Sequence, residues 1–147
     1  MFEKLAIHYY NEEQMSDALY NQIQECYHRA EAFMTKEAKY IINTTHLFHD
    51  FYLSECSIYC DHGSKKCRIA LSNKREVYTI LLYGVCSLSI VGELVSDKAE
   101  YPKSEQGFAF AQVLALWLDY QAFFDICLLL DNERYIIIRA NEFSIIK

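Results

Sequence analysis

The last third of the chain has the clearest alternation of apolar and polar positions. Between Phe124 and Leu130 every second residue is apolar, a polar segment follows at 131–134, and an apolar run resumes at 135–139. A period of two with a polar interruption predicts two strands joined by a tight turn. Residues 136–138 are three successive isoleucines, so both faces of the last strand are apolar, which predicts a strand covered on both sides.

The middle of the chain has the same short apolar runs. A polar segment at 61–66 contains a glycine and predicts a hairpin turn, and Gly84 indicates either a bend or a bulge within one long strand. Residues 96–106 are the most polar stretch and predict a surface loop or a flap. The predicted strands before the last one are 52–60, 67–71, 76–83, 85–91, 113–120 and 124–131.

The N-terminal region follows a helical period instead. Five apolar residues are spaced four, three, four and three apart, which predicts an amphipathic helix from about residue 15 to 42. A break near Thr35 into two helices is an open alternative, and residues 2–10 fit either a strand or a helix. The stripe consists of Leu19, Ile23, Cys26, Ala30 and Phe33.

These patterns together predict an α+β fold. The chain of 147 residues is expected to form a single domain, with 1–46 mainly helical and 47–147 mainly antiparallel β. The N-terminal helical unit is expected to pack on one face of a six- or seven-stranded antiparallel sheet, because its apolar stripe needs a partner surface.

Charge and composition restrict the function classes. The formal net charge is -6, which disfavours nucleic acid as a partner and allows a basic protein. The longest stretch without charge, Val77 to Gly92, has 16 residues and is shorter than the roughly 20 apolar residues that a spanning helix needs. We therefore expect a cytoplasmic protein without membrane contact, and its six cysteines are expected to be reduced thiols.

One group of side chains has the composition of a zinc site. Cys56, Cys60, His62 and Cys67 supply three thiols and one imidazole within twelve residues. A turn centred between residues 63 and 64 would place Cys60 opposite Cys67. The two-residue spacing of a zinc knuckle is absent, and Cys56 lies about 13 Å from Cys60 along an extended strand. Free thiols are therefore expected in place of a metal site formed by Cys60, His62 and Cys67, and no cofactor is predicted.

A second group, His46, His49 and Asp50, resembles the adjacent His-Asp ligands of metal-dependent phosphohydrolases. The helices that would supply the remaining ligands are absent, and on a strand His49 and Asp50 would point to opposite faces. No phosphate-binding, dinucleotide-binding, esterase or zinc-protease motif occurs. A small ligand-binding or metal-dependent enzyme using this group or the cysteines is the alternative function.

The sequence is also rich in aromatic residues, with one tryptophan, twelve tyrosines and nine phenylalanines. Tyrosine serves equally at the edge of a core and at a protein interface, because its ring packs while its hydroxyl stays hydrated. One cluster is predicted as a surface for a protein partner or for self-association. It consists of Trp117, Asp119, Tyr120, Phe123 and Phe124.

Three features carry a resemblance over residues 47–147. They are Phe48-His49-Asp50 before a strand, an apolar strand that ends in Gly84-Val85, and the closing strands 124–130 and 136–146. In this hydrophobic pattern the chain resembles a loose group of small uncharacterised bacterial proteins, some of them similar to immunity proteins that neutralise a toxin. The resemblance implies a protein partner. The leading prediction is a non-enzymatic protein-binding module, which leaves a homodimer open.

Overall fold

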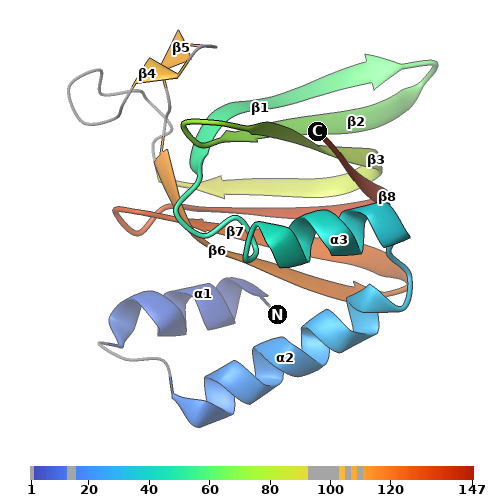
Figure 1. The fold of residues 1–147 in the computed structure, drawn as a ribbon. Coiled ribbons are helices and arrows are strands. Elements are labelled where there is room, and N and C mark those ends of the chain that lie inside the picture. The colour runs from blue at the N-terminus through green and yellow to red at the C-terminus, as the bar shows by residue number, and fades with distance from the viewer. Residues whose placement is uncertain (1, 13–15, 93–102, 105–106, 109–110) are drawn as a thin grey trace.

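The computed structural model describes residues 2–12, 16–92, 103–104, 107–108 and 111–147. Three helices come first and the strands follow (Figure 1). The helices are α1 (Phe2–Asn11), α2 (Asp17–Glu31) and α3 (Lys36–Thr44). The strands are β1 (Tyr52–Asp61), β2 (Ser64–Ser72), β3 (Val77–Val91), β4 (Lys103–Ser104), β5 (Gly107–Phe108), β6 (Ala111–Gln121), β7 (Phe123–Leu130) and β8 (Tyr135–Ile146).

Six strands form one antiparallel sheet that closes into a barrel in the order β1-β2-β3-β8-β7-β6. Among the residues that the structure describes, β1 and β6 pair at Tyr52–Gln112 and Leu53–Ala111. The predicted α+β class is confirmed, with the N-terminal helical unit packed against a six-stranded antiparallel sheet. Most of the predicted loop at 96–106 lies outside the described residues.

The helical region is divided into separate helices because a polar residue caps the N-terminus of α2 and another caps the N-terminus of α3. The Ser16 hydroxyl accepts a hydrogen bond from the Leu19 amide at 3.2 Å, and the Thr35 hydroxyl accepts one from the Ala38 amide at 3.1 Å. The break near Thr35 is therefore real, and residues 2–11 are helical. None of the described helices is long and apolar enough to cross a membrane.

β3 is one long strand with a bend at Gly84. The residue has φ of 62°, and a side chain there would collide with the side chain of Asn141 on β8. The pairing with β8 shifts between Val85 and Ser87, which marks a bulge. At this point β3 and β8 turn from one layer of the barrel into the other (Figure 1).

The wall made by β6, β7 and β8 is buried on both sides. Ile136 and Ile138 point into the barrel and belong to its core. On the outer side, α1 and α2 cover a second cluster that includes Trp117 and Cys127, with Ile137 packed against it. The predicted covered strand at 136–138 is confirmed, and the helices are what cover it (Figure 1).

The Tyr10 hydroxyl connects α1 to the turn between β7 and β8 by hydrogen bonds. Its hydroxyl oxygen lies 2.6 Å from the Leu130 carbonyl oxygen and 2.7 Å from that of Arg134, and it accepts a hydrogen bond from the Leu130 amide at 3.1 Å. Burial raises the pKa of the Tyr10 phenol above its ordinary value.

Replacing Tyr10 with phenylalanine should lower the free energy of unfolding by about 1–3 kcal/mol, because the backbone groups of the turn lose their partner. Urea denaturation of the variant measures the change. The control is Tyr40→Phe, since Tyr40 is 70% exposed and should tolerate the change. Equal stability of the two variants would contradict the anchoring role.

Candidate functional site

The sheet separates the residues of the predicted aromatic patch. Trp117 is buried under α1, where its ring centroid lies 6.0 Å from that of Phe2 and 5.7 Å from that of Tyr9. Phe124 is buried in the barrel interior beside Phe143. Trp117 and Phe124 are therefore core residues, which corrects their predicted place on an exposed patch. Successive strand residues point to opposite faces, and here both faces are covered.

Asp119 is likewise buried, with 1% of its surface exposed. Its carboxylate accepts two hydrogen bonds from Arg29 of α2, from Nε at 2.9 Å and from Nη2 at 3.1 Å. It also accepts one from the Tyr120 amide at 2.7 Å. The hydrogen bond to Asp119 raises the pKa of Arg29. Asp119 thus joins α2 to the end of β6 through its bond with Arg29.

The other two predicted residues, Tyr120 and Phe123, are half-buried beside the turn between β6 and β7. The Phe33 ring stacks on Tyr120 with centroids 3.8 Å apart, yet 59% of Phe33 is exposed. The sequence pattern placed Phe33 on the buried helix stripe. It faces outward because α2 ends at Glu31, before the residue is reached. We call Phe33, Tyr120 and Phe123 the aromatic end.

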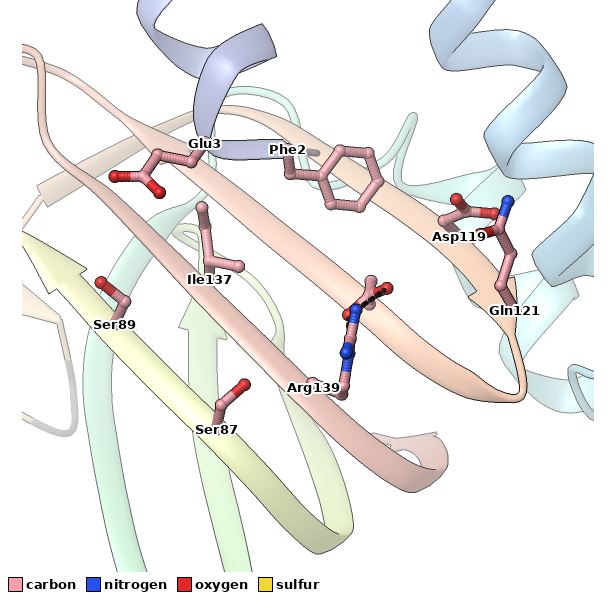
Figure 2. Close-up of a pocket in the computed structure, with 9 residues that line it drawn as sticks. Phe2, Glu3, Ser87, Ser89, Asp119, Gln121, Ile137 and Arg139 are labelled. Carbon is pink, nitrogen blue, oxygen red and sulfur yellow. Dashed lines mark hydrogen bonds and ion pairs between the residues drawn. The ribbon is translucent and has the colours of Figure 1, made fainter.

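A polar cleft adjoins the aromatic end on the outer face of the barrel (Figure 2). It has a volume of about 220 Å³, and we call it the α1 cleft because the start of α1 forms one wall. Arg139 binds Asp125 there through Nε at 2.8 Å and Nη2 at 3.2 Å. The Arg139 guanidinium also lies 6.0 Å from the Phe123 ring. The lining residues are Phe2, Glu3, Ser87, Ser89, Asp119, Gln121, Asp125, Ile137 and Arg139.

The side chains of the α1 cleft are suited to recognition. The Arg139–Asp125 pair lines the cleft and holds its charges in fixed, two-point geometry, and the lining residue Asp119 is bound in the same way by Arg29, which reaches it from α2 outside the lining. The serines have no neighbouring histidine among the lining residues that could act as a base. The arrangement can therefore orient polar groups of a partner beside an exposed aromatic ring.

The cysteine–histidine group does not assemble. Asp61 pairs with Ser64, so the turn is centred one residue earlier than predicted, and Cys60 lies opposite Lys65. Cys67 is buried in the barrel, whereas Cys60 and His62 are exposed at the hairpin tip. Among the residues that the structure describes, no group of three or more His, Cys, Asp or Glu side chains could hold a metal ion.

His46, His49 and Asp50 lie in the turn between α3 and β1. His49 Nδ1 is 3.1 Å from an Asp50 carboxylate oxygen, and both side chains are exposed. The condition under which they were expected to point to opposite faces does not hold, because both residues precede the strand and Asp50 has a left-handed φ of 68°. The Asp50 carboxylate also accepts a hydrogen bond from Gln112 Nε2 at 3.1 Å, which ties the turn to β6.

The thiols should differ sharply in their reaction with iodoacetamide. Burial raises the pKa of Cys26 to about 11 and that of Cys127 to about 12, and the hydrogen bond with Cys56 raises the pKa of buried Cys67. A raised pKa lowers the thiolate fraction, which is the reactive form. We expect exposed Cys60 and Cys86 to be labelled first in the native protein. Peptide mass spectrometry over time measures this, and labelling of Cys26 at the rate of Cys60 would contradict the packing.

Comparisons with known proteins identify no family for this chain. No family model matches the chain, and no curated protein matches it. One similar solved structure is described as the crystal structure of an uncharacterized protein from Neisseria gonorrhoeae. It shares 17% sequence identity, with a TM-score of 0.46, and the match covers 68% of this chain and 93% of that chain. A similarity of this degree carries no argument about function.

Proposed function

We propose that the protein is a non-enzymatic protein-binding module whose contact surface is the aromatic end with the adjoining α1 cleft. The observation that carries the proposal is the exposed Phe33 ring, stacked on Tyr120 and 59% accessible. Arg29 lies one helical turn before Phe33 and binds buried Asp119, the neighbour of Tyr120. The ring is thus held in place on the surface.

A fixed aromatic ring on the surface suits a protein interface. Aromatic side chains and arginine are enriched at the centres of interfaces, where they contribute most of the binding energy. A side chain that is already ordered loses little conformational entropy on binding. Phe123 and Arg139 supply two of these residue types beside the α1 cleft, because Arg139 both lines the cleft and lies 6.0 Å from the Phe123 ring, and Phe33 supplies a further exposed aromatic ring just after α2.

The partner in this proposal is a basic protein. The net charge is -6, and Asp17 and Glu25 are exposed on α2, which attracts a basic surface over a distance. The resemblance to immunity proteins supports a toxin as that partner, with the complex forming in the cytoplasm. The proposed binding requires no cofactor.

The test is affinity capture from the native lysate with the tagged protein, followed by mass spectrometry. Phe33→Asp places a charge on the exposed ring position, and we expect it to reduce capture of the partner about tenfold or more. Tyr40→Asp is the matched control, because Tyr40 is also an exposed aromatic residue but lies on α3. Capture of the same protein in equal amounts by both variants would refute the proposed surface.

A further inference from the structure

The second half of β3 is a strand edge. Residues 85–91 pair with β8 on one side, whereas β2 pairs with β3 only as far as Tyr83. Within the described part of the chain, no strand pairs with the other side of this segment. Cys86, Ser87, Ser89 and Ile90 are exposed along it. An unpaired edge presents backbone donors and acceptors to a further strand.

Apart from the bulge between Val85 and Ser87 at its start, this edge lacks the sequence features that hinder pairing with another strand. Proteins protect their edges with charged residues or proline, and residues 85–91 contain neither. Beyond Leu53, β1 pairs within the described residues with β2 alone, and this part by contrast contains Glu55 and Asp61. The two edges have exposed apolar side chains in common, with Ile58 on β1 and Ile90 on β3. Of these two edges, as far as the structure describes them, the β3 edge is the one that combines exposed apolar residues with the absence of charge.

Two clefts lie on the two sides of this edge. The α1 cleft contains Ser87 and Ser89, whose side chains Figure 2 shows on the same side of the sheet as Arg139. A second cleft of about 370 Å³, which we call the hairpin cleft, lies beneath the tip of the β1–β2 hairpin. Ser87 lines both clefts. The hairpin cleft is lined by Ile58, Tyr59, Cys60, Lys65, Val85, Cys86, Ser87 and Leu88.

We propose that an extended strand of the partner protein adds to the edge at residues 85–91. This inference rests on the proposed function, and it names the element that the partner contributes. Alternate side chains of a strand point to opposite faces, so an added strand would direct one set toward the hairpin cleft and the other toward the α1 cleft. The backbone hydrogen bonds between the partner strand and residues 85–91 supply affinity. The two clefts determine which side chains of the partner strand fit.

The linings specify the chemistry of that strand. Ile58, Val85 and Leu88 make the hairpin cleft largely apolar, so the side chains directed there are apolar. The α1 cleft holds Glu3 and the Asp125–Arg139 pair, so the side chains directed there are long and polar or charged. The partner strand therefore alternates apolar and polar residues.

The same linings disfavour a second copy of this chain as the occupant. Two copies paired through residues 85–91 would each offer Ser87 and Ser89 to the α1 cleft of the other. A serine side chain is too short to fill a cleft of about 220 Å³ or to reach the Asp125–Arg139 pair. A strand from a different protein, with longer polar side chains, fills the α1 cleft.

The test selects ligands for the full chain from a displayed library of random peptides of about ten residues, the length of a long strand. We expect enriched peptides to alternate apolar and polar residues and to bind in fluorescence polarisation. Each selected peptide is then N-methylated at every second amide, in the two complementary sets. A strand hydrogen-bonds through one edge, so one set should weaken binding about tenfold or more and the other should have little effect.

A protein variant locates the same contact. Ile90→Lys puts a charge on the edge and should weaken peptide binding about tenfold. Ile146→Lys is the control, since Ile146 is 45% exposed and Ile90 is 44% exposed, and Ile146 lies at the end of β8. Enrichment of no peptide, equal loss from both methylated sets, or full affinity with Ile90→Lys would overturn the strand addition.

Two outcomes separate this inference from the proposed function. Peptides that lose affinity with Phe33→Asp but not with Ile90→Lys would support the aromatic end and overturn the added strand. A dimer of the wild-type protein in sedimentation, dispersed by Ile90→Lys and retained by Ile146→Lys, would assign the edge to a second copy and also overturn the inference. Binding that depends on Ile90 but not on Phe33 would refute the proposed surface while supporting strand addition.

Discussion

Replacing Trp117 with alanine should lower the free energy of unfolding by about 3–5 kcal/mol, the range for removing a buried large aromatic side chain. Trp117 packs against Phe2 and Tyr9 of α1, so its removal leaves a cavity beneath that helix. Chemical denaturation followed by far-UV circular dichroism measures the change, because the variant has no tryptophan to report by fluorescence.

The comparison variant is Phe123→Ala at the nearby turn. Phe123 is half-buried and lies beside the Arg139 guanidinium, so its loss should cost about 1 kcal/mol or less. Its expected effect is on partner binding instead. A Trp117→Ala protein of near-wild-type stability that failed to bind the partner would contradict the assignment of Trp117 to the core.

Replacing Arg29 with alanine should be the second strongly destabilising change. It leaves the Asp119 carboxylate, which is 1% exposed, without its guanidinium partner. Removing one partner of a buried pair costs about 3–5 kcal/mol, and the lower end applies here because Arg29 is 40% exposed and water can enter. Thermal and urea unfolding of the variant measure the loss.

Two controls define the origin of that loss. The double variant Arg29→Met with Asp119→Leu should recover most of the stability, because no buried charge remains unpaired. Arg139→Ala breaks a pair that is half exposed at the arginine, so we expect about 1 kcal/mol or less. If Arg29→Ala and Arg139→Ala destabilised the protein equally, the buried pair would have no special role.

Local patterns were sufficient to predict the fold class. The alternation from Phe124 to Leu130 and the triple isoleucine at 136–138 both correspond to observed strands, since these signals reside in neighbouring residues. The closure of the barrel has no such signal. Among the described residues it rests on the pairs Tyr52–Gln112 and Leu53–Ala111 between β1 and β6, whose partners are about sixty residues apart in sequence.

For the predicted contact surface, the sequence pattern indicates which strand face a side chain lies on. It does not indicate which other element covers that face. Trp117 lies on the strand face opposite to Leu116 and Leu118, and the position of α1 over that face shows that it is buried. The pairing of Asp119 with Arg29 spans 90 residues and has no sequence motif. Phe33 fitted the helical stripe by spacing, and the end of α2 at Glu31 changed its exposure.

The small errors in the hairpin had a similar origin. A polar segment of six residues predicts a turn without fixing its centre, and register follows the turn geometry. With Asp61 paired to Ser64, Cys60 lies opposite Lys65, and the predicted pairing of Cys60 with Cys67 is lost. The position of the turn therefore determines that Cys60 and Cys67, which were considered as zinc ligands, do not lie opposite each other.

The most direct test of the proposed function is the dissociation constant of the captured partner, measured by calorimetry for the wild type, Phe33→Asp and Tyr40→Asp. The aromatic end predicts a loss of about tenfold or more for Phe33→Asp, because a charge at the centre of an interface is desolvated without a partner. Tyr40→Asp should bind like the wild type. Equal affinity of all three proteins would contradict the binding surface proposed for Phe33, Tyr120 and Phe123.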